Sequence, residues 1–127
     1  MSDIVFDASA VLALVNGEPG NDVVLANLAD GVISAVNLAE VVTKLTELAL
    51  DEAEIRDSID TLGLRVVPCD AALAFAAGML RPVTRAYGLS LGDRICVALA
   101  QHLDTPVLTA ERIWRNLNLS VEVRLIR

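Results

Sequence analysis

The chain has 127 residues, of which 54% are hydrophobic but only 3% aromatic, and its formal net charge is −7. This length suits a single domain over residues 1–127, with a core built mainly from aliphatic side chains. The acidic charge argues against a general nucleic-acid binder, which carries a basic face, and no apolar run approaches the roughly 20 residues of a membrane span.

Short apolar segments alternate with longer segments of helical periodicity along the chain. This alternation predicts an α/β fold in which helices cover a central parallel β-sheet. The predicted strands lie near Ile4–Asp7, Val32–Ser34, Arg65–Pro68, Pro106–Leu108 and Ser120–Leu125. The predicted helices lie near Ala8–Val15, Asn21–Ala29, Leu38–Leu50, Glu52–Leu62, Ala71–Leu80 and Leu91–His102, with a short one after Pro82.

Two of the predicted helices carry extended apolar stretches. The stripe within residues 38–50 favours a core-facing side over an interaction groove. Residues 71–80 contain many small side chains, which would pack closely against a neighbour in the same chain or across a dimer. Phe6 and Phe75 are both expected to be buried, and Trp114 is expected in the core rather than at a surface that contacts bases.

The two cysteines and the single histidine are too few for a zinc site. Zinc takes three or four nitrogen and sulfur ligands, and Cys69, Cys96 and His102 are separated in the sequence. We expect both thiols to be free and buried, and His102 to complement the end of a helix. Free thiols, together with the absence of a basic residue before the first apolar run, indicate a reducing cytoplasm rather than export.

Four acidic residues each lie where an apolar run meets a predicted helix. Asp7 ends IVFD, Glu40 lies in SAVNLAEV, Asp93 in LSLGDRICVALA and Glu111 in VLTAERIW. Because the carboxyl ends of parallel strands share one edge of a sheet, these acids can converge in a crevice there. Carboxylates clustered without cations raise one another's pKa unless they bind a divalent ion. The pattern therefore predicts a Mg²⁺ or Mn²⁺ site.

Each acid also has a structural explanation when it is considered alone. Asp7 could cap the helix that follows it, and Glu111 could favour the positive end of a short helix. The NLAE and SLGD segments resemble capping boxes, which would place Glu40 and Asp93 at the third helical position, and Glu40 could also pair with Lys44. Several unpaired carboxylates in one crevice nevertheless require compensation, which favours the metal site.

The acidic segments are similar in order and spacing to those of a known family. VFDASA, the glutamate after NLA, LSLGDRICVALA and LTAERIW resemble the PIN-domain ribonucleases, in particular the VapC-type toxins of toxin–antitoxin modules. The resemblance covers essentially the whole chain, and its most specific part is LSLGDRICVALA together with LTAERIW. It implies a three-layer α/β/α sandwich around a parallel sheet, and cleavage of RNA that depends on one or two Mg²⁺ or Mn²⁺ ions. It also implies a cognate antitoxin and a homodimer.

The same resemblance implies roles for individual residues. The acids expected to bind the metal and to carry catalysis are Asp7, Glu40 and Asp93. Ser9 and Thr109 match hydroxyl positions that line the same pocket. The fourth acid of the family is usually the aspartate of a TAD segment, whereas this chain has Glu111 in TAE. The longer side chain implies a weaker or water-mediated role for Glu111.

The predicted reaction is hydrolysis of a phosphodiester bond by a metal-activated water. Asp7 and Asp93 would hold the main ion, Glu40 would position or help to deprotonate the water, and Glu111 would support a second ion. The candidates for gripping phosphate are Arg94, Arg112 and Arg115, because a guanidinium matches the geometry of phosphate. Arg94 could instead brace Asp93 or another acid.

Three alternatives share some of these features. A receiver-like signalling domain would need adjacent acids after the first strand and a lysine after the last, but Asp7 precedes Ala8 and Ser9, and the only lysine is Lys44. A haloacid-dehalogenase-type phosphatase would need an aspartate in place of Ser9. A PIN-like module without catalysis, which dimerises or binds a partner, stays open because Glu111 departs from the family pattern.

Overall fold

A five-stranded parallel β-sheet forms the centre of the molecule in the computed structural model, which describes residues 2–127. The strands are β1 (Ile4–Phe6), β2 (Gly31–Ser34), β3 (Arg65–Val67), β4 (Val107–Thr109) and β5 (Val123–Leu125). Their order across the sheet is β3-β2-β1-β4-β5. All five predicted strands are present, and the predicted parallel arrangement is confirmed.

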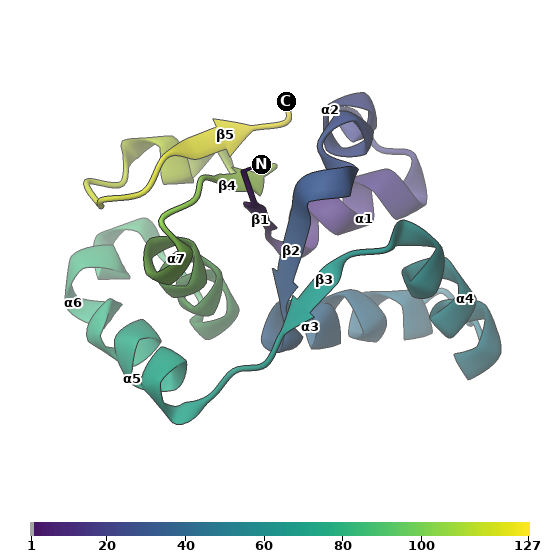
Figure 1. The fold of residues 1–127 in the computed structure, drawn as a ribbon, viewed down its shortest axis with the longest axis horizontal. Coiled ribbons are helices and arrows are strands. Elements are labelled where there is room, and N and C mark those ends of the chain that lie inside the picture. Colours follow the sequence, from purple (N-terminus) through teal and green to yellow (C-terminus); the bar gives the residue numbers. More distant parts are fainter. Residues whose placement is uncertain (1) are drawn as a thin grey trace.

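Helices occupy both sides of this sheet (Figure 1). The α-helices are α1 (Ala8–Asn16), α2 (Asn21–Ala26), α3 (Ala35–Thr46), α4 (Glu52–Leu62), α5 (Ala71–Met79), α6 (Arg81–Thr84) and α7 (Leu91–Leu103). Short 3₁₀ turns are η1 (Leu28–Asp30), η2 (Arg85–Tyr87) and η3 (Arg112–Asn116). Helix α3 begins three residues before its predicted start because Ser34 caps it, with the hydroxyl accepting the N–H of Asn37 at 2.9 Å.

Two hydrophobic cores, one on each face of the sheet, give the predicted three-layer α/β/α sandwich. Successive strand residues point to opposite faces, so Val5 packs with α5 and α7, while Ile4 and Phe6 pack with α1, α3 and α4. Trp114 lies in the first core at 1% exposure, as predicted. The strands β1, β2 and β4 are buried on both faces, as is typical of a parallel sheet covered by helices.

The order of the strands places a crevice beside β1. The chain passes outward from β1 through β2 to β3, and it then returns to β4 on the other side of β1. The helix that follows β1 therefore covers one face, while α7, which leads into β4, covers the other face (Figure 1). The two connections diverge at the carboxyl end of β1, where such folds leave room for a ligand.

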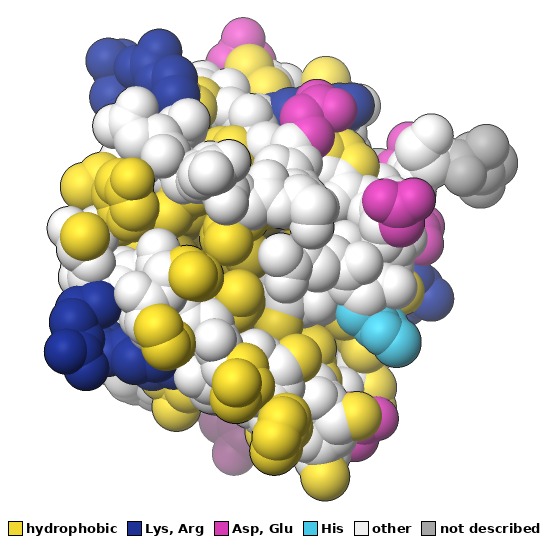
Figure 2. Space-filling view, turned by 90° about the vertical axis from the view of Figure 1, so that its left-hand side faces the viewer, with side chains coloured by type: hydrophobic (Ala, Val, Ile, Leu, Met, Phe, Trp, Pro, Cys, Tyr) yellow, Lys and Arg dark blue, Asp and Glu magenta, His cyan; other side chains and the backbone are white. Residues whose placement is uncertain are grey.

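Helices α5 and α6 present an apolar surface to solvent, which corrects the prediction that Phe75 is buried. Figure 2 faces the side of the molecule on which these helices lie, and hydrophobic side chains gather there. Phe75 is 73% exposed and Met79 64% exposed, and Val83 is exposed as well. In α5 the core side is filled by Leu73 and Ala77, so the larger phenylalanine ring is left outside.

The apolar stripe of α3 is only partly in the core. Val41 and Leu45 are buried, as predicted, whereas Leu38 and Val42 line an open groove of about 540 Å³ between α3 and α4. The outer part of the stripe therefore faces this groove rather than the core.

The two cysteines differ in burial. Both are free, as predicted, but Cys96 is buried and Cys69 is only partly buried.

The helices of the described chain are all too short or too polar to cross a lipid bilayer.

The C-terminal segment passes close to the start of α2 at Gly20, where the lack of a side chain leaves room for it. The φ of Gly20 is +93°, and a Cβ at this position would lie 2.5 Å from the backbone oxygen of Ile126. We predict that Gly20→Ala lowers the free energy of unfolding by about 2 kcal/mol or more, through both backbone strain and this clash. Gly17→Ala is the matched control, because Gly17 has φ +66° but no atom within 4 Å of its Cβ position. Urea unfolding followed by circular dichroism measures both, and equal losses would contradict the close approach.

Candidate metal and catalytic site

Asp7 follows the last residue of the central strand β1 and caps helix α1. Its Oδ1 accepts hydrogen bonds from the backbone N–H of Ala10 at 2.9 Å and from the hydroxyl of Ser9 at 2.7 Å. Its Oδ2 accepts a hydrogen bond from the hydroxyl of Thr109 at 2.6 Å. The side chain is only 3% exposed. Both oxygens of a buried carboxylate are therefore held by neutral donors, and no cationic side chain of residues 2–127 pairs with it.

Ser9 and Thr109 form a hydroxyl network around Asp7. Ser9 lines the cleft as predicted, whereas Thr109 is buried behind Asp7 and does not line it. Thr109 ends β4, the neighbour of β1, and its hydroxyl lies 3.3 Å from that of Ser9. The Ser9 hydroxyl accepts the N–H of Ala110 at 2.9 Å, and the Thr109 hydroxyl accepts the N–H of Glu111 at 2.9 Å. The network fixes the Asp7 carboxylate relative to the segment that carries Glu111.

Glu40 lies in the second turn of α3, so the predicted NLAE capping box is wrong. Ser34, not Asn37, caps this helix, which moves Glu40 beyond the first turn. The Glu40 carboxylate instead accepts a hydrogen bond from Nδ2 of Asn37 at 2.7 Å. The predicted pair between Glu40 and Lys44 is also not formed, since the Lys44 ammonium lies 3.8 Å from Glu47.

Asp93 lies in the first turn of α7, and its predicted capping box is present. Its Oδ2 accepts the backbone N–H of Ser90 at 2.9 Å, while the Ser90 hydroxyl accepts the N–H of Asp93 at 3.2 Å. Glu111 precedes η3 and is exposed, and its side chain makes no capping hydrogen bond there. One carboxylate oxygen of Asp93 therefore accepts no backbone hydrogen bond, and neither carboxylate oxygen of Glu111 does within the described chain.

All four predicted acids line one cleft of about 320 Å³. The other residues around it are Ala8, Ser9, Leu12, Thr43 and Lys44. Among the described residues, none of the four acids forms an ion pair, because the five ion pairs use other carboxylates. Lys44 is the one cationic side chain of the described chain that borders the cleft, and it stands beside Glu47. The cleft is therefore strongly acidic.

The donor atoms in this cleft suit a hard divalent cation, although they are not arranged as a finished coordination shell. Carboxylate and hydroxyl oxygens are the ligands that Mg²⁺ and Mn²⁺ prefer. Within residues 2–127, no three acidic, histidine or cysteine side chains converge closely enough to hold an ion. Among the four acids, the exposed Glu111 has the least restrained side chain.

Burial raises the pKa of the Asp7 carboxyl from 3.8 to about 6. The hydrogen bonds from Thr109, Ser9 and Ala10 oppose this shift, and the charge of Asp93 adds to it. Burial also raises the pKa of the Cys96 thiol well above its usual value, and the charges of Asp7, Asp93 and Glu40 contribute in the same direction. Cys96 is therefore a neutral thiol, and a cation in the cleft would favour ionised Asp7.

The arginines predicted to grip phosphate do not line the cleft. Arg94 turns toward α5, where its Nη1 donates to the backbone oxygen of Ala77 at 3.2 Å, and its Nε is buried without a partner. That contact complements the carboxyl end of α5, so the alternative in which Arg94 braces Asp93 is wrong as well. Arg112 and Arg115 lie exposed on η3, after Glu111, and do not border the cleft.

Three residues at the cleft were not predicted as part of the site. Asn37 and Gly92 contact the Glu40 carboxylate, and Lys44 borders the cleft. Asn37 and Gly92 occur within the two acidic segments, three residues before Glu40 and one before Asp93. The sequence shows that these residues lie close to the acids along the chain. It does not show that α3 contacts α7, which brings Asn37 and Gly92 to the same carboxylate.

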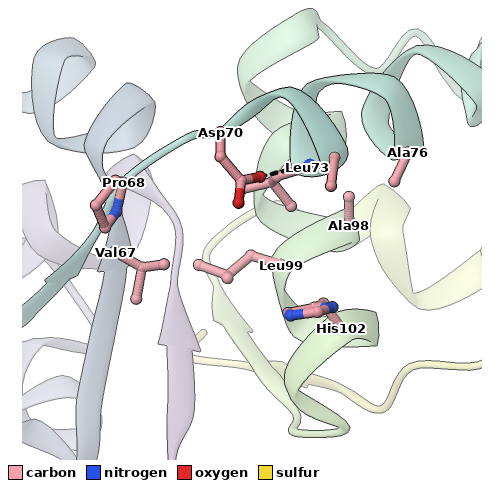
Figure 3. Close-up of a pocket in the computed structure, with 9 residues that line it drawn as sticks. Val67, Pro68, Asp70, Leu73, Ala76, Ala98, Leu99 and His102 are labelled. Atoms are coloured by element: carbon pink, nitrogen blue, oxygen red, sulfur yellow. Dashed lines mark hydrogen bonds between the residues drawn. The ribbon is translucent and has the colours of Figure 1, made fainter.

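A second cavity, of about 140 Å³, lies between the end of β3 and helices α5 and α7 (Figure 3). Its lining is mainly apolar, and its ionisable side chains are Asp70 and His102. Asp70 is engaged in capping α5, because its Oδ1 accepts the N–H of Leu73 at 2.9 Å. His102 lies in the last turn of α7, as predicted. This cavity does not include any of the four clustered acids.

The pKa of Asp7 predicts an unusual dependence of stability on pH. Because the folded-state pKa is raised, ionisation of Asp7 destabilises the fold as the pH rises from about 4 to above 6. In EDTA, Asp7→Asn should therefore equal the wild type in stability near pH 4 and exceed it by about 3 kcal/mol near pH 8. Urea unfolding across this range measures the difference. The surface variant Asp57→Asn is the control, and a difference for Asp7→Asn that does not grow with pH would contradict the assignment.

Comparisons with known proteins agree with this architecture. The chain matches the PIN domain family over residues 4–118. No curated protein matches it in sequence. Its structure is similar to a chain of VapBC2 from Rickettsia felis bound to a DNA fragment from their promoter, with a TM-score of 0.74, 15% identity and coverage of 96% of this chain and 97% of that one.

Two further solved structures have the same fold. A chain of DNA-bound VapBC from Salmonella typhimurium has a TM-score of 0.72 and 15% identity, with 100% of each chain covered. A member of the VapBC family of toxin–antitoxin systems, VapBC-5 from Mycobacterium tuberculosis, has a TM-score of 0.60 and 23% identity over 100% of this chain and 99% of that one. The family match argues against the receiver-like and phosphatase-like alternatives. The strand order β3-β2-β1-β4-β5 also differs from the order 2-1-3-4-5 of receiver domains. The chain belongs to the PIN domain family.

Proposed function

We propose that the protein is a divalent-metal-dependent endoribonuclease that acts as the toxin of a toxin–antitoxin pair. The observation that supports this most is the single cleft lined by Asp7, Glu40, Asp93 and Glu111, none of which forms an ion pair within the described chain. Membership of the PIN domain family supports nuclease chemistry at such a cleft. The cation is Mg²⁺ or Mn²⁺, as one or two ions.

The acids have distinct roles in this proposal. Asp7 and Asp93 hold the main ion, with Asp7 oriented by the hydroxyls of Ser9 and Thr109 and Asp93 by the N–H of Ser90. When bound, the cation supplies an acidified water and stabilises negative charge at the reacting phosphorus. Glu40 positions the attacking water and accepts its proton.

Glu111 has the outermost role. It is exposed, and its N–H bond to Thr109 anchors only its backbone. Its carboxylate supports a second, weaker ion, either directly or through water. The same exposure favours the second candidate function, a PIN-like module that binds partners without catalysis, because a loosely held fourth acid would leave the site incomplete.

Phosphate contacts are assigned first to Lys44, which borders the cleft. Arg112 and Arg115 do not line the cleft, but they follow Glu111 on η3 and are assigned contacts with more distant phosphates of the substrate. Arg94 is not assigned this role, because it is engaged with the carbonyl of Ala77. A flexible lysine suits contact with a phosphate that arrives with the substrate.

The proposed partner is a cognate antitoxin. The solved structures with this fold include VapBC complexes and a toxin–antitoxin complex from Klebsiella pneumoniae. The net charge of −7 suits a partner that brings positive charge. We also propose that the protein forms a homodimer and acts in the cytoplasm, where its RNA target occurs and where the free thiols of Cys69 and Cys96 are stable.

Asp93→Asn should abolish RNA cleavage while it preserves the fold. The amide oxygen of asparagine can still accept the N–H of Ser90, so the cap of α7 is kept, whereas the charge that binds the cation is lost. The measurement is cleavage of total bacterial RNA by purified protein with Mn²⁺ or Mg²⁺, compared with EDTA. We expect discrete metal-dependent fragments from the wild type and from the control Asp57→Asn. Cleavage by Asp93→Asn at the wild-type rate would contradict the assignment.

Glu111→Gln should reduce cleavage less than Asp93→Asn does. Because Glu111 is exposed and its carboxylate is not restrained, we expect a loss of roughly tenfold, compared with at least 1,000-fold for Asp93→Asn. Initial rates over a Mn²⁺ titration measure both. A loss at Glu111 as large as that at Asp93 would show that Glu111 binds the main ion, and no cleavage by the folded wild type with either metal would favour the partner-binding module.

A further inference from the structure

Asn37 is a buried amide that links the end of β2, helix α3 and helix α7. It is 1% exposed, and its Oδ1 accepts the hydroxyl of Ser34 at 2.6 Å. Its Nδ2 donates to Oε1 of Glu40 at 2.7 Å and to the backbone oxygen of Gly92 at 3.1 Å. Both hydrogens of the Nδ2 amide group are therefore used, one in a bond to Glu40 and one in a bond to α7.

Gly92 contacts the same carboxylate from the other helix. A Cβ at Gly92 would lie 2.3 Å from Oε2 of Glu40 and 2.6 Å from its Cδ. The Glu40 carboxylate thus lies directly against the backbone of α7, in the space that any other side chain at position 92 would fill. Gly92 is buried, and the next residue in the chain is Asp93.

One hydrogen bond and one close approach fix the place of the Glu40 carboxylate. Asn37 donates to Oε1, and Gly92, which has no side chain, leaves room for the carboxylate beside the backbone of α7. Asp93 is restrained independently by the N–H of Ser90. The separation of the Glu40 and Asp93 carboxylates therefore depends on the contact between α3 and α7.

We propose that Asn37 and Gly92 are positioning residues that hold Glu40 against the helix carrying Asp93, so that both carboxylates face the same divalent cation. The inference rests on the proposed metal-dependent function and adds to it the residues that set the geometry of the site. A small error in the position of one ligand lowers the affinity of a metal site, which is why the groups that orient the ligands matter.

A purely structural role would have different consequences. If Asn37 and Gly92 only joined α3 to α7, their substitution would lower stability and leave metal affinity unchanged. Gly92→Ala separates the two roles, because alanine is the better helix former and the atoms it meets are the far end of the flexible Glu40 side chain. The Glu40 carboxylate would move, and the helices would stay in place.

The test measures Mn²⁺ binding to the metal-free protein by isothermal titration calorimetry, together with thermal unfolding in EDTA. We expect Gly92→Ala to weaken Mn²⁺ binding at least tenfold with an unchanged or higher unfolding temperature. Gly78→Ala is the matched control, because it lies in helix α5 with no atom within 4 Å of its Cβ position, and it should bind Mn²⁺ as the wild type does.

A second variant tests whether both residues act through Glu40. Asn37→Ala removes the donor to Oε1 and should also weaken Mn²⁺ binding. The two substitutions release the same carboxylate. The double variant Asn37→Ala with Gly92→Ala should therefore have an affinity for Mn²⁺ only slightly below that of the single variant with the lower affinity. If the residues acted independently, the two fold-losses of affinity would multiply.

The outcomes distinguish this inference from the proposed function. Wild-type Mn²⁺ affinity in Gly92→Ala would overturn the positioning role, and so would losses that multiply in the double variant. Losses of affinity that come with lower unfolding temperatures in both single variants would overturn it too, because the helices themselves would then be damaged. If the wild type itself neither binds Mn²⁺ nor cleaves RNA, the proposed function fails instead.

Discussion

The buried Asp7 carboxylate is the constraint on which the rest of the site depends. It stands at the end of the central strand, where the order of the strands makes the helices diverge. Hydroxyl and backbone donors hold it, and no cationic side chain in the described part of the chain pairs with it. Burial raises its pKa to about 6, so the fold tolerates the charge at a cost in free energy. A nearby divalent cation would offset that cost, so the proposed metal site and the local instability would coincide at this position.

The acids of the cleft also build the secondary structure that positions them. Asp7 caps α1 and Asp93 completes the capping box of α7, so structural and functional explanations of these residues are compatible. Each capping bond occupies carboxylate oxygens with backbone N–H groups and fixes the direction of the side chain. Glu40 has no such cap and is oriented instead by Asn37 and by the space beside Gly92. Glu111 has neither kind of support and is exposed.

Much of the fold could be predicted from the sequence, because hydrophobic periodicity and the turn residues of this chain agree with the final topology. The convergence of the four acids could also be predicted, since Asp7 and Glu111 follow strands and Asp93 begins a helix at one edge of the sheet, although Glu40 lies one turn further into its helix than predicted. The direction of Arg94 could not be predicted, because residues adjacent in a helix point to different sides, and the carbonyl of Ala77 comes from a distant segment. The exposure of Phe75 was hidden for a related reason, since only the packing of α5 on α7 decides which side of an apolar helix is covered.

The central claim is that the acidic cleft binds a divalent cation. The most direct measurement is anomalous X-ray diffraction from crystals of the metal-free protein soaked in Mn²⁺ near pH 7.5. We predict an anomalous peak between Asp7 and Asp93, within direct or water-mediated reach of Glu40, and no such peak in crystals of Asp93→Asn. An empty cleft in well-diffracting crystals of the wild type, or a peak elsewhere in the molecule with none beside Asp7, would contradict the claim.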